Sequence, residues 1–350
     1  TSIAGNLCTA PALMGNTVVW KAATTSVLSA QVIMDILLEA GLPKGVVNLV
    51  HAPGSMVGKS ALSHPDLAGV HFTGSTATFQ HMWSQVGQNI KNYRTYPRLV
   101  GETGGKDFIF AHPSADLSAL TPAIIRGGFE YQGQKCSAPS RLYIPASLWP
   151  ELQDRLEAEI SQIKMGDITD FQNFMGAVID QNSFNHIKGY LDRVSSGSGA
   201  KVVIGGKCDD STGFFIEPTL VLAEDPKHEL MSEELFGPVV TAYVYPDDKI
   251  PEALTLCDTT SPYALTGAVF SQDRYAASEI MQRLRFAAGN FYINDKPTGA
   301  VVGQQPFGGG RASGTNDKAG SPLNLQRWTS PRTVKETMVP STRWDYPFMS

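Results

Sequence analysis

The first hundred residues alternate between two spacings of apolar positions. Short apolar runs rich in β-branched residues occupy 17–21, 46–50 and 69–73, and each is typical of a buried strand. Between the first two runs, apolar residues recur every four positions and predict a helix over 26–40 that the Gly-Leu-Pro of 41–43 ends. These residues are Leu28, Val32, Ile36 and Ala40. Strands that alternate with helices predict a parallel, doubly wound sheet, which binds ligands beyond the carboxyl ends of its strands.

A second alternating region begins after residue 106. Its apolar runs predict strands at 107–110, 141–145, 201–204 and 239–245. Its helical periodicity predicts helices over 117–129, 148–163 and 182–194. The fold class is therefore α/β throughout. A chain of 350 residues with 42% hydrophobic residues can bury sizeable cores, and we expect two domains.

Charge and cysteine content narrow the classes of partner. The chain is 17% charged, has a net charge of −5 and contains no basic block, which argues against nucleic acid or an anionic membrane surface as the main partner. No apolar run is long enough to span a bilayer. The four cysteines have unrelated spacings, which predict neither a disulfide framework nor a metal site and are typical of a reducing compartment. We expect a small-molecule substrate.

The candidate chemistry lies in two short motifs. Residues 102–106 read Glu-Thr-Gly-Gly-Lys, and Cys136 follows Glu102 by 34 positions within Gly-Gln-Lys-Cys-Ser-Ala-Pro-Ser-Arg. A thiolate is a strong nucleophile if its surroundings favour the anion, and Lys135 is the adjacent cation. A glutamate can activate water if burial lifts its pKa toward neutrality. The glycine pair allows a tight turn and the close approach of a flat ligand.

Cys136 differs from the other three cysteines in its surroundings. It lies between small and polar residues typical of a loop, where functional groups concentrate, whereas buried cysteines are ordinary core residues. We interpret Cys8, Cys208 and Cys257 as structural. A Cys/His hydrolase remains an alternative, although no local signature pairs Cys136 with the nearest histidine, His112.

These motifs resemble those of the NAD(P)-dependent aldehyde dehydrogenases. The resemblance extends through Phe-Thr-Gly-Ser at 72–75, Glu-Glu-Leu-Phe-Gly-Pro at 233–238 and Pro-Phe-Gly-Gly at 306–309, in the family's order. It is closest to the branch that oxidises Δ1-pyrroline-5-carboxylate, on the segments 290–296, 298–309 and 313–318 and on the tail from 327. It implies a partial Rossmann-type NAD-binding domain over 1–105, an α/β catalytic domain over 106–312, a return to the coenzyme domain over 313–330 and an oligomerisation tail over 331–350. A homodimer or higher homo-oligomer is the expected assembly.

The resemblance also assigns roles to residues. Cys136 is the implied nucleophile and Glu102 the implied base. The residues implied to bind the coenzyme are Lys21, Gly74, Ser75, Glu234 and Phe236. Thr24 stands where many relatives have an acidic residue for the ribose 2′-hydroxyl, so NAD is expected but the choice against NADP stays open. Phe79 occupies a position where many relatives carry glycine.

The segment 298–309 carries the substrate hypothesis. A glycine-rich loop offers backbone donors for a carboxylate, and a phenylalanine can cover an aliphatic chain. The resemblance implies Ser137, Gly299 and Ala300 around the substrate carboxylate and Phe307 against its methylenes. The implied reaction oxidises glutamate γ-semialdehyde to glutamate through a thioester. Oxidation of another short semialdehyde, acyl transfer to coenzyme A and a non-catalytic fragment that acts only in oligomerisation remain alternatives.

The N-terminus has no initiator methionine and no signal pattern, so we expect a fragment or a processed chain. In the resembled family the preceding segment supplies early coenzyme-domain elements and an asparagine that stabilises the oxyanion. By the same resemblance to animal enzymes, we expect the mitochondrial matrix as the compartment.

Overall fold

The computed structural model describes residues 2–197, 199–301 and 303–349. Thr1 and Ser350, which bound the expected domains at 1–105 and 331–350, lie outside the described residues. So does Val302, within the expected substrate loop at 298–309.

The strands of the N-terminal part form two parallel pairs. β1 (Val18–Lys21) pairs with β2 (Val47–Val50), and β3 (Gly69–Thr73) pairs with β4 (Arg98–Glu102). The helices between and around them are α1 (Ser2–Leu13), α2 (Val27–Glu39), α3 (Gly54–Ala61) and α4 (Thr76–Gln88). The predicted strands, the helix over 26–40 and the parallel pairing are confirmed. Among the described residues, however, the two pairs are separate two-stranded sheets instead of one continuous sheet.

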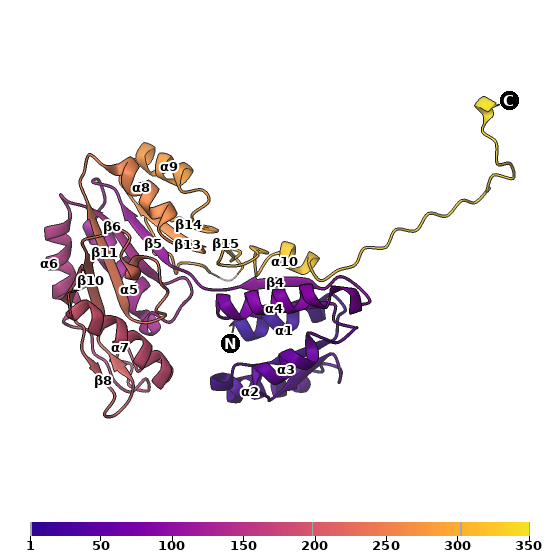
Figure 1. Ribbon diagram of the computed structural model, residues 1–350, viewed down its shortest axis with the longest axis horizontal. Coiled ribbons are helices and arrows are strands. Elements are labelled where there is room, and N and C mark those ends of the chain that lie inside the picture. The colour runs from indigo at the N-terminus through magenta and orange to yellow at the C-terminus, as the bar shows by residue number, and fades with distance from the viewer. Residues whose placement is uncertain (1, 198, 302, 350) are drawn as a thin grey trace.

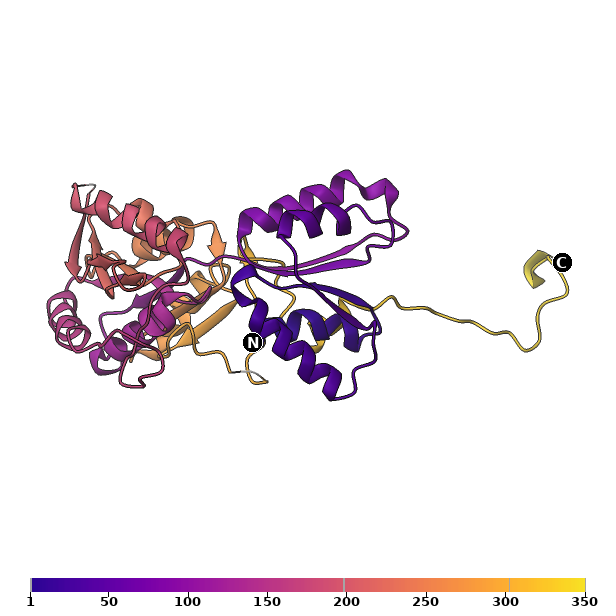
Figure 2. The same cartoon turned by 90° about the horizontal axis from the view of Figure 1, so that it is seen from below.

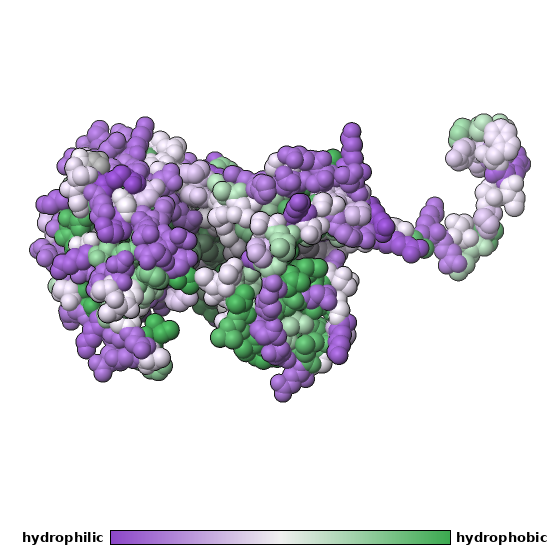
Figure 3. Space-filling view, turned by 60° about the horizontal axis from the view of Figure 1, so that its bottom comes forward, coloured by the Kyte–Doolittle hydropathy of each residue, from purple (hydrophilic) through white to green (hydrophobic). Residues whose placement is uncertain are grey.

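The apolar stripe of α2 faces outward. This helix buries Ala30 and Met34 against Trp20 of β1, while Leu28 is 78% exposed and Val32 and Ile36 are also exposed. Figure 3 shows hydrophobic surface gathered over this part of the molecule. The periodicity therefore identified the helix correctly but not the face that packs.

A seven-stranded sheet forms the centre of the second part. Its strand order is β14-β13-β5-β6-β11-β10-β7, parallel except for β7. The strands are β5 (Asp107–Ala111), β6 (Pro139–Pro145), β7 (Ala200–Ile204), β10 (Thr219–Ala223), β11 (Val239–Tyr245), β13 (Thr266–Phe270) and β14 (Asn290–Ile293). Two short antiparallel pairs flank it: β8 (Cys208–Asp209) with β9 (Phe215–Ile216), and β12 (Tyr263–Ala264) with β15 (Gly310–Arg311). The four predicted strands of this region are confirmed within two residues at each end.

Helices cover both faces of this sheet (Figure 1). Successive residues of a strand point to opposite faces, so Ile109 of β5 packs with α5 (Leu117–Phe129) and α6 (Trp149–Ile160), while Phe108 and Phe110 pack with α8 (Ile250–Thr259) and α9 (Arg274–Arg283). α7 (Gln181–Ser195) packs near the β7 edge of the sheet, in a further apolar cluster. Burial on both faces explains why β5 reads as a nearly continuous apolar run in the sequence.

The chain finally returns from the second part to the first. After β15 it forms an isolated bridge between Gly314 and Glu102 of β4, and then α10 (Pro322–Gln326). Trp328 packs with Ala10 and Val100, which closes the return segment onto the N-terminal part. Beyond it the chain extends away from the body and ends in a short 3-10 turn, as Figures 1 and 2 show. Within the described ranges, no helix is long and apolar enough to cross a membrane.

Candidate active site

Glu102 and Cys136 lie at the junction between the two parts. Glu102 is the last residue of β4, and the thiol stands on the turn between α5 and β6. That turn is forced through three consecutive left-handed residues, Tyr131, Gln132 and Gly133. At Gly133 an added Cβ would come 2.5 Å from the carbonyl oxygen of Gly237, so glycine is required there both for its φ of 64° and for space. The sharp turn lifts Cys136 out of the helix and presents it just before β6, at the amino end of the parallel strands β5 and β6.

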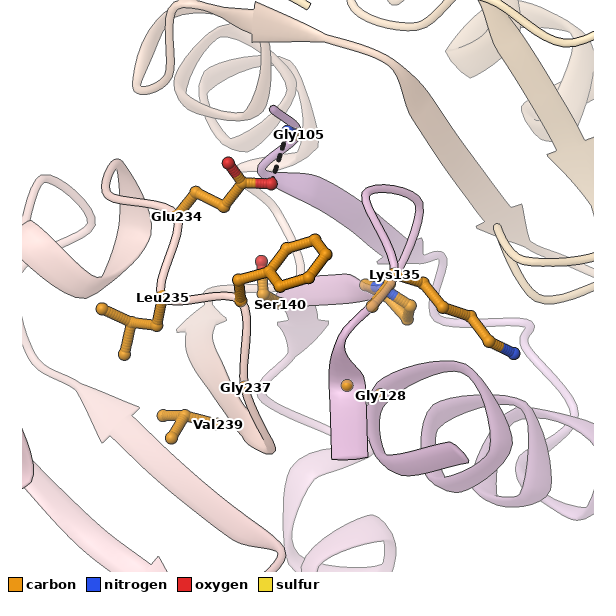
Figure 4. Close-up of a pocket in the computed structure, with 12 residues that line it drawn as sticks. Gly105, Gly128, Lys135, Ser140, Glu234, Leu235, Gly237 and Val239 are labelled. Carbon is orange, nitrogen blue, oxygen red and sulfur yellow. Dashed lines mark hydrogen bonds between the residues drawn. The ribbon is translucent and has the colours of Figure 1, made fainter. Parts of the chain in front are cut away.

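The Cys136 thiol is held in its protonated form. Burial raises its pKa to about 12, and the nearby carboxyl groups of Asp107, Glu102 and Glu234 add to this effect. Lys135 does not compensate, because its ammonium pairs with Glu130 at 2.6 Å. Figure 4 shows the Lys135 side chain directed away from Glu234 and out of the pocket. The expectation that Lys135 favours the thiolate is therefore wrong: the residue adjacent in sequence points to another partner.

Burial raises the pKa of Glu102 to about 8. Lys318 lowers this pKa, Asp317 raises it, and the backbone N–H of Gly309 lowers it by donating a hydrogen bond. Within the described part of the chain, Oε2 of Glu102 is buried without a hydrogen-bond partner. The carboxyl group is thus poised to exchange a proton near neutral pH, as the sequence predicted for a base that activates water.

A group of buried charged residues lies behind the cysteine loop. Burial lowers the pKa of Lys106 to about 7 and raises that of Asp107 well above its usual range. Arg141 is fully buried and its Nε donates to the carbonyl oxygen of Lys106 at 2.6 Å. Asp107 accepts from the backbone N–H of Thr266 at 2.6 Å, and the Thr266 hydroxyl donates to the carbonyl oxygen of Ser137 at 3.3 Å. This chain of bonds fixes the backbone that follows Cys136.

Glu234 faces the glycine pair of the glutamate motif. One of its carboxylate oxygens accepts from the N–H of Gly105 at 2.9 Å, as Figure 4 shows. A Cβ on Gly104 would lie 2.2 Å from the other oxygen, so only glycine fits between the carboxylate and the turn. Phe236 is 45% exposed and adopts a φ of 54° in the same pocket lining. The result is a flat polar cradle beside an exposed ring, which suits a planar, hydroxylated ligand.

The α4 N-terminus joins this cradle. Ser75 caps α4 by accepting from the N–H of Thr78 at 3.3 Å, and the N–H of Gly74 donates to the carbonyl oxygen of Glu102 at 3.2 Å. Thr76, in the first turn, accepts from the N–H of Gly104 at 3.3 Å. Gly74, Ser75 and Glu234 are therefore brought into one linked region, with a helix N-terminus that can receive an anion.

Lys21 stands apart from this region. It ends β1, and a Cβ on Gly54, the first residue of α3, would lie 3.8 Å from its Nζ. Phe79 occupies space under β4: its ring stacks on Phe72 and would collide with a Cβ on Gly101. This packing accounts for a large residue at position 79, because the glycine opposite leaves room for the ring.

The expected substrate residues are divided between two segments. Ser137 is buried beside the thiol, while Gly299, Ala300 and Phe307 belong to the loop that leads to β15. The N–H of Gly299 already donates to the carbonyl oxygen of Lys296 at 3.0 Å, so in this arrangement it is not a free donor for a carboxylate, contrary to expectation. In the described part of the chain, no acceptor is recorded for the N–H of Ala300. Phe307 is half-buried and pairs with Ala319 through two backbone hydrogen bonds.

Several residues of the site received no role from the sequence. Lys106 stands in the glutamate motif and Lys318 in the segment 313–318, so both were near recognised patterns, but neither motif specifies what a lysine contacts. Asp107 and Arg141 read only as the start of a strand and the end of a motif. All four cysteines are free thiols. No cluster of three or more His, Cys, Asp or Glu suited to a metal ion occurs in the described ranges.

Comparison with known proteins adds relatives to this geometry. Residues 4–334 match the model of the aldehyde dehydrogenase family. The chain is 55% identical over 351 residues to the mitochondrial delta-1-pyrroline-5-carboxylate dehydrogenase of Dictyostelium discoideum, covering 100% of this chain and 63% of that protein. It is 53% identical over 350 residues to the human protein of that name, covering 100% of this chain and 62% of the relative.

Comparison with solved structures finds the same group of relatives. The fold matches the crystal structure of the Mycobacterium tuberculosis delta-pyrroline-5-carboxylate dehydrogenase bound with NAD, with a TM-score of 0.93 and 55% identity, over 99% of this chain and 64% of that one. The chain thus spans a little under two thirds of the length of these relatives.

Proposed function

The chain belongs to the aldehyde dehydrogenase family, and from that premise we propose that it serves the NAD-dependent oxidation of L-glutamate γ-semialdehyde to L-glutamate. The observation that carries the proposal is a loop cysteine within the electrostatic reach of a half-buried glutamate whose pKa is about 8. The names of the relatives supply the substrate: Δ1-pyrroline-5-carboxylate, which opens by hydrolysis to the semialdehyde. The reaction belongs to proline catabolism.

Cys136 and Glu102 divide the chemistry. The Cys136 sulfur bonds to the aldehyde carbon, and the thiol proton is released. The backbone N–H of Cys136 is one donor to the oxyanion that forms; one such donor is worth about 2.7–4 kcal/mol. Loss of hydride from that carbon leaves a thioester on Cys136. Glu102 then takes a proton from water, and the water oxygen attacks the thioester carbonyl. The carbon–sulfur bond breaks, the carboxylic acid is released, and the proton held by Glu102 passes to the leaving sulfur, which restores the thiol and the base.

NAD, when bound, supplies the hydride acceptor. The residues proposed to hold it are Lys21, Gly74, Ser75, Glu234 and Phe236. Support comes from the cradle between Glu234 and the glycine pair, which a Cβ would fill, and from the helix N-terminus that Ser75 caps. The NAD-bound crystal structure of a 55% identical relative agrees with this choice of coenzyme.

Ser137, Ala300 and Phe307 are proposed to bind the substrate, with Gly299 joining them once its N–H leaves Lys296. Ser137 lies next to the thiol, and Phe307 stands where the return segment meets the glycine loop. Discrimination against semialdehydes without an α-carboxylate would come from these backbone donors.

The organisation of the whole protein is also proposed. We assign 1–105 and 313–330 to the coenzyme domain and 106–312 to the catalytic domain. The extended segment 331–350 is proposed to mediate a homodimer or higher homo-oligomer, since exposed apolar residues line its described part. These residues are Val334, Met338, Val339, Trp344, Tyr346 and Phe348. The mitochondrial matrix is the proposed compartment, from the names of the relatives.

The test is NADH formation by residues 1–350 with Δ1-pyrroline-5-carboxylate. Turnover should vanish in Cys136→Ala and should be slower with succinate semialdehyde, which lacks the amino-acid head group. In Glu102→Gln, one equivalent of NADH per site should still form rapidly. Steady turnover should fall by about 10²–10⁴-fold, because hydrolysis of the thioester has lost its general base. A preference for succinate semialdehyde would move the proposal to another semialdehyde. Absence of turnover together with absence of NAD binding would favour the non-catalytic alternative.

A further inference from the structure

Lys318 is half-buried in the turn of the return segment that faces the glycine loop. Its Nζ donates to the carbonyl oxygens of Gly289 at 2.8 Å and Gly308 at 3.0 Å and to Oδ1 of Asn290 at 3.2 Å. These are three neutral acceptors and no carboxylate. Lys318 also holds a φ of 52°, a left-handed conformation that lysine rarely adopts and that costs on the order of 1 kcal/mol or more. The fold therefore maintains a strained lysine that forms no ion pair with any of the residues that the structure describes.

Glu102 is the carboxyl group next to this turn. The position of a Cβ on Gly308 lies 2.9 Å from Oε1 of Glu102, 3.2 Å from Oδ1 of Asn316 and 3.3 Å from the backbone N of Lys318. Gly308 therefore has three polar atoms close to the side that a Cβ would occupy: the Glu102 carboxyl oxygen, the Asn316 amide oxygen and the Lys318 backbone nitrogen. Lys318 bonds the carbonyl of that same glycine, so its side chain holds the loop against which Glu102 rests.

Two opposite charges act on Glu102. The positive charge of Lys318 lowers its pKa and the negative charge of Asp317 raises it, and Glu102 in turn raises the pKa of the Cys136 thiol. Asp317 is fixed by Arg327 at 3.0 Å and by the hydroxyl of Thr315 at 2.5 Å. Asp317 and Lys318 are adjacent in one turn and carry opposite charges, so a change of charge at either residue shifts the pKa of Glu102.

We infer that Lys318 is a positioning residue for Glu102: its ammonium ties the glycine loop and the return segment around the carboxyl group, and its charge, opposed by Asp317, sets the pH at which Glu102 can accept a proton from water. The inference rests on the proposed role of Glu102 as the base. It gives the return segment a function in hydrolysis of the thioester, distinct from its role in joining the two parts of the molecule.

The direct test is to titrate Glu102 itself. In protein labelled with ¹³C at the glutamate carboxyl carbon, the Glu102 signal is assigned by its loss in Glu102→Gln. Lys318→Gln, which keeps a donor but removes the charge, should raise the titration midpoint by about 1 pH unit or more. Lys318→Arg should leave the midpoint near that of the unmodified chain. Asp317→Asn should lower it, because a negative charge is removed.

An unchanged midpoint in folded Lys318→Gln overturns the inference, as does an equal rise in Lys318→Arg. If Lys318→Gln does not fold, Asp317→Asn decides, and a midpoint that fails to fall refutes the charge balance. A purely structural lysine would reduce the first NADH burst and the steady rate together; a positioning lysine should leave the burst and move the acidic limb of the steady rate with the midpoint. Because the titration needs no turnover, an inactive chain would refute the proposed function without deciding this inference.

Discussion

Replacing Glu102 by glutamine should stabilise the protein at alkaline pH. Burial raises the pKa of this carboxyl group from 4.5 to about 8, so between these values the folded protein retains a proton that the unfolded chain has released. Stability from this group is therefore complete below pH 4.5 and is lost as the pH rises through 8. At about 1.4 kcal/mol per pH unit the loss has a ceiling on the order of 5 kcal/mol, and relaxation around a half-buried group reduces it to roughly 2–3 kcal/mol.

Urea unfolding at pH 5 and pH 9 tests this reasoning. Glutamine has nearly the same shape and does not titrate, so Glu102→Gln should match the unmodified chain at pH 5 and exceed it at pH 9. Comparing the two proteins at each pH cancels groups that titrate in this range without acting on Glu102, such as Lys106. A stability difference that is the same at both pH values would show that the carboxyl group is not held protonated, and would remove the basis for its role as a base poised near neutrality.

Two paired substitutions test the packing of the site. Gly104→Ala should weaken NAD binding at least tenfold, measured by NADH fluorescence titration, because the new Cβ would lie 2.2 Å from an oxygen of Glu234; Gly189→Ala, in an open helical position, should leave binding unchanged and stabilise by about 0.5–1 kcal/mol. Arg141→Met should lower the unfolding free energy by about 3 kcal/mol, since two buried carbonyl oxygens lose their donor. Arg155→Met, which breaks an exposed i,i+4 pair, should cost under about 1 kcal/mol in the same denaturation assay.

The spacing of apolar residues predicted the helices and strands of the second part well, because the apolar face of each element is also the face that is buried in the structure. The helix over 117–129 was predicted with its observed bounds: Asp116 caps its start by accepting from Ser118, and its apolar stripe packs on the sheet. In the first part the apolar face and the buried face differ. The stripe of Leu28 and Ile36 on α2 has the correct spacing yet faces solvent, since the burial of a face depends on what packs beside it and no local pattern states that.

The contents of the site were predictable and its electrostatics were not. Cys136 and Glu102 stand in distinctive motifs, so residue type and spacing alone pointed to them. Their protonation depends on contacts between distant segments: the N–H of Gly101 donates to Thr315, 214 residues away, and this pairing brings Lys318 to Glu102. Sequence adjacency gave a wrong prediction for Lys135: it lies next to Cys136 in the chain, but its ammonium pairs with Glu130 and not with the thiol.

Burial is the largest cause of the raised pKa of both the thiol and the glutamate. Glu102, Asp107 and Glu234 surround Cys136 in a largely dry site, and groups of like charge in such surroundings cannot all ionise together. The first proton lost by any of them makes the next one harder to lose, so the cluster titrates as a unit. Cys136 must be an anion to attack, and Glu102 must be an anion to accept a proton. A negative charge on either one disfavours a negative charge on the other, but the two charges are needed at different steps. Formation of the thioester removes the thiol from that competition. The positive charge of Lys318 favours the ionised form of Glu102 at the step in which Glu102 has to accept a proton.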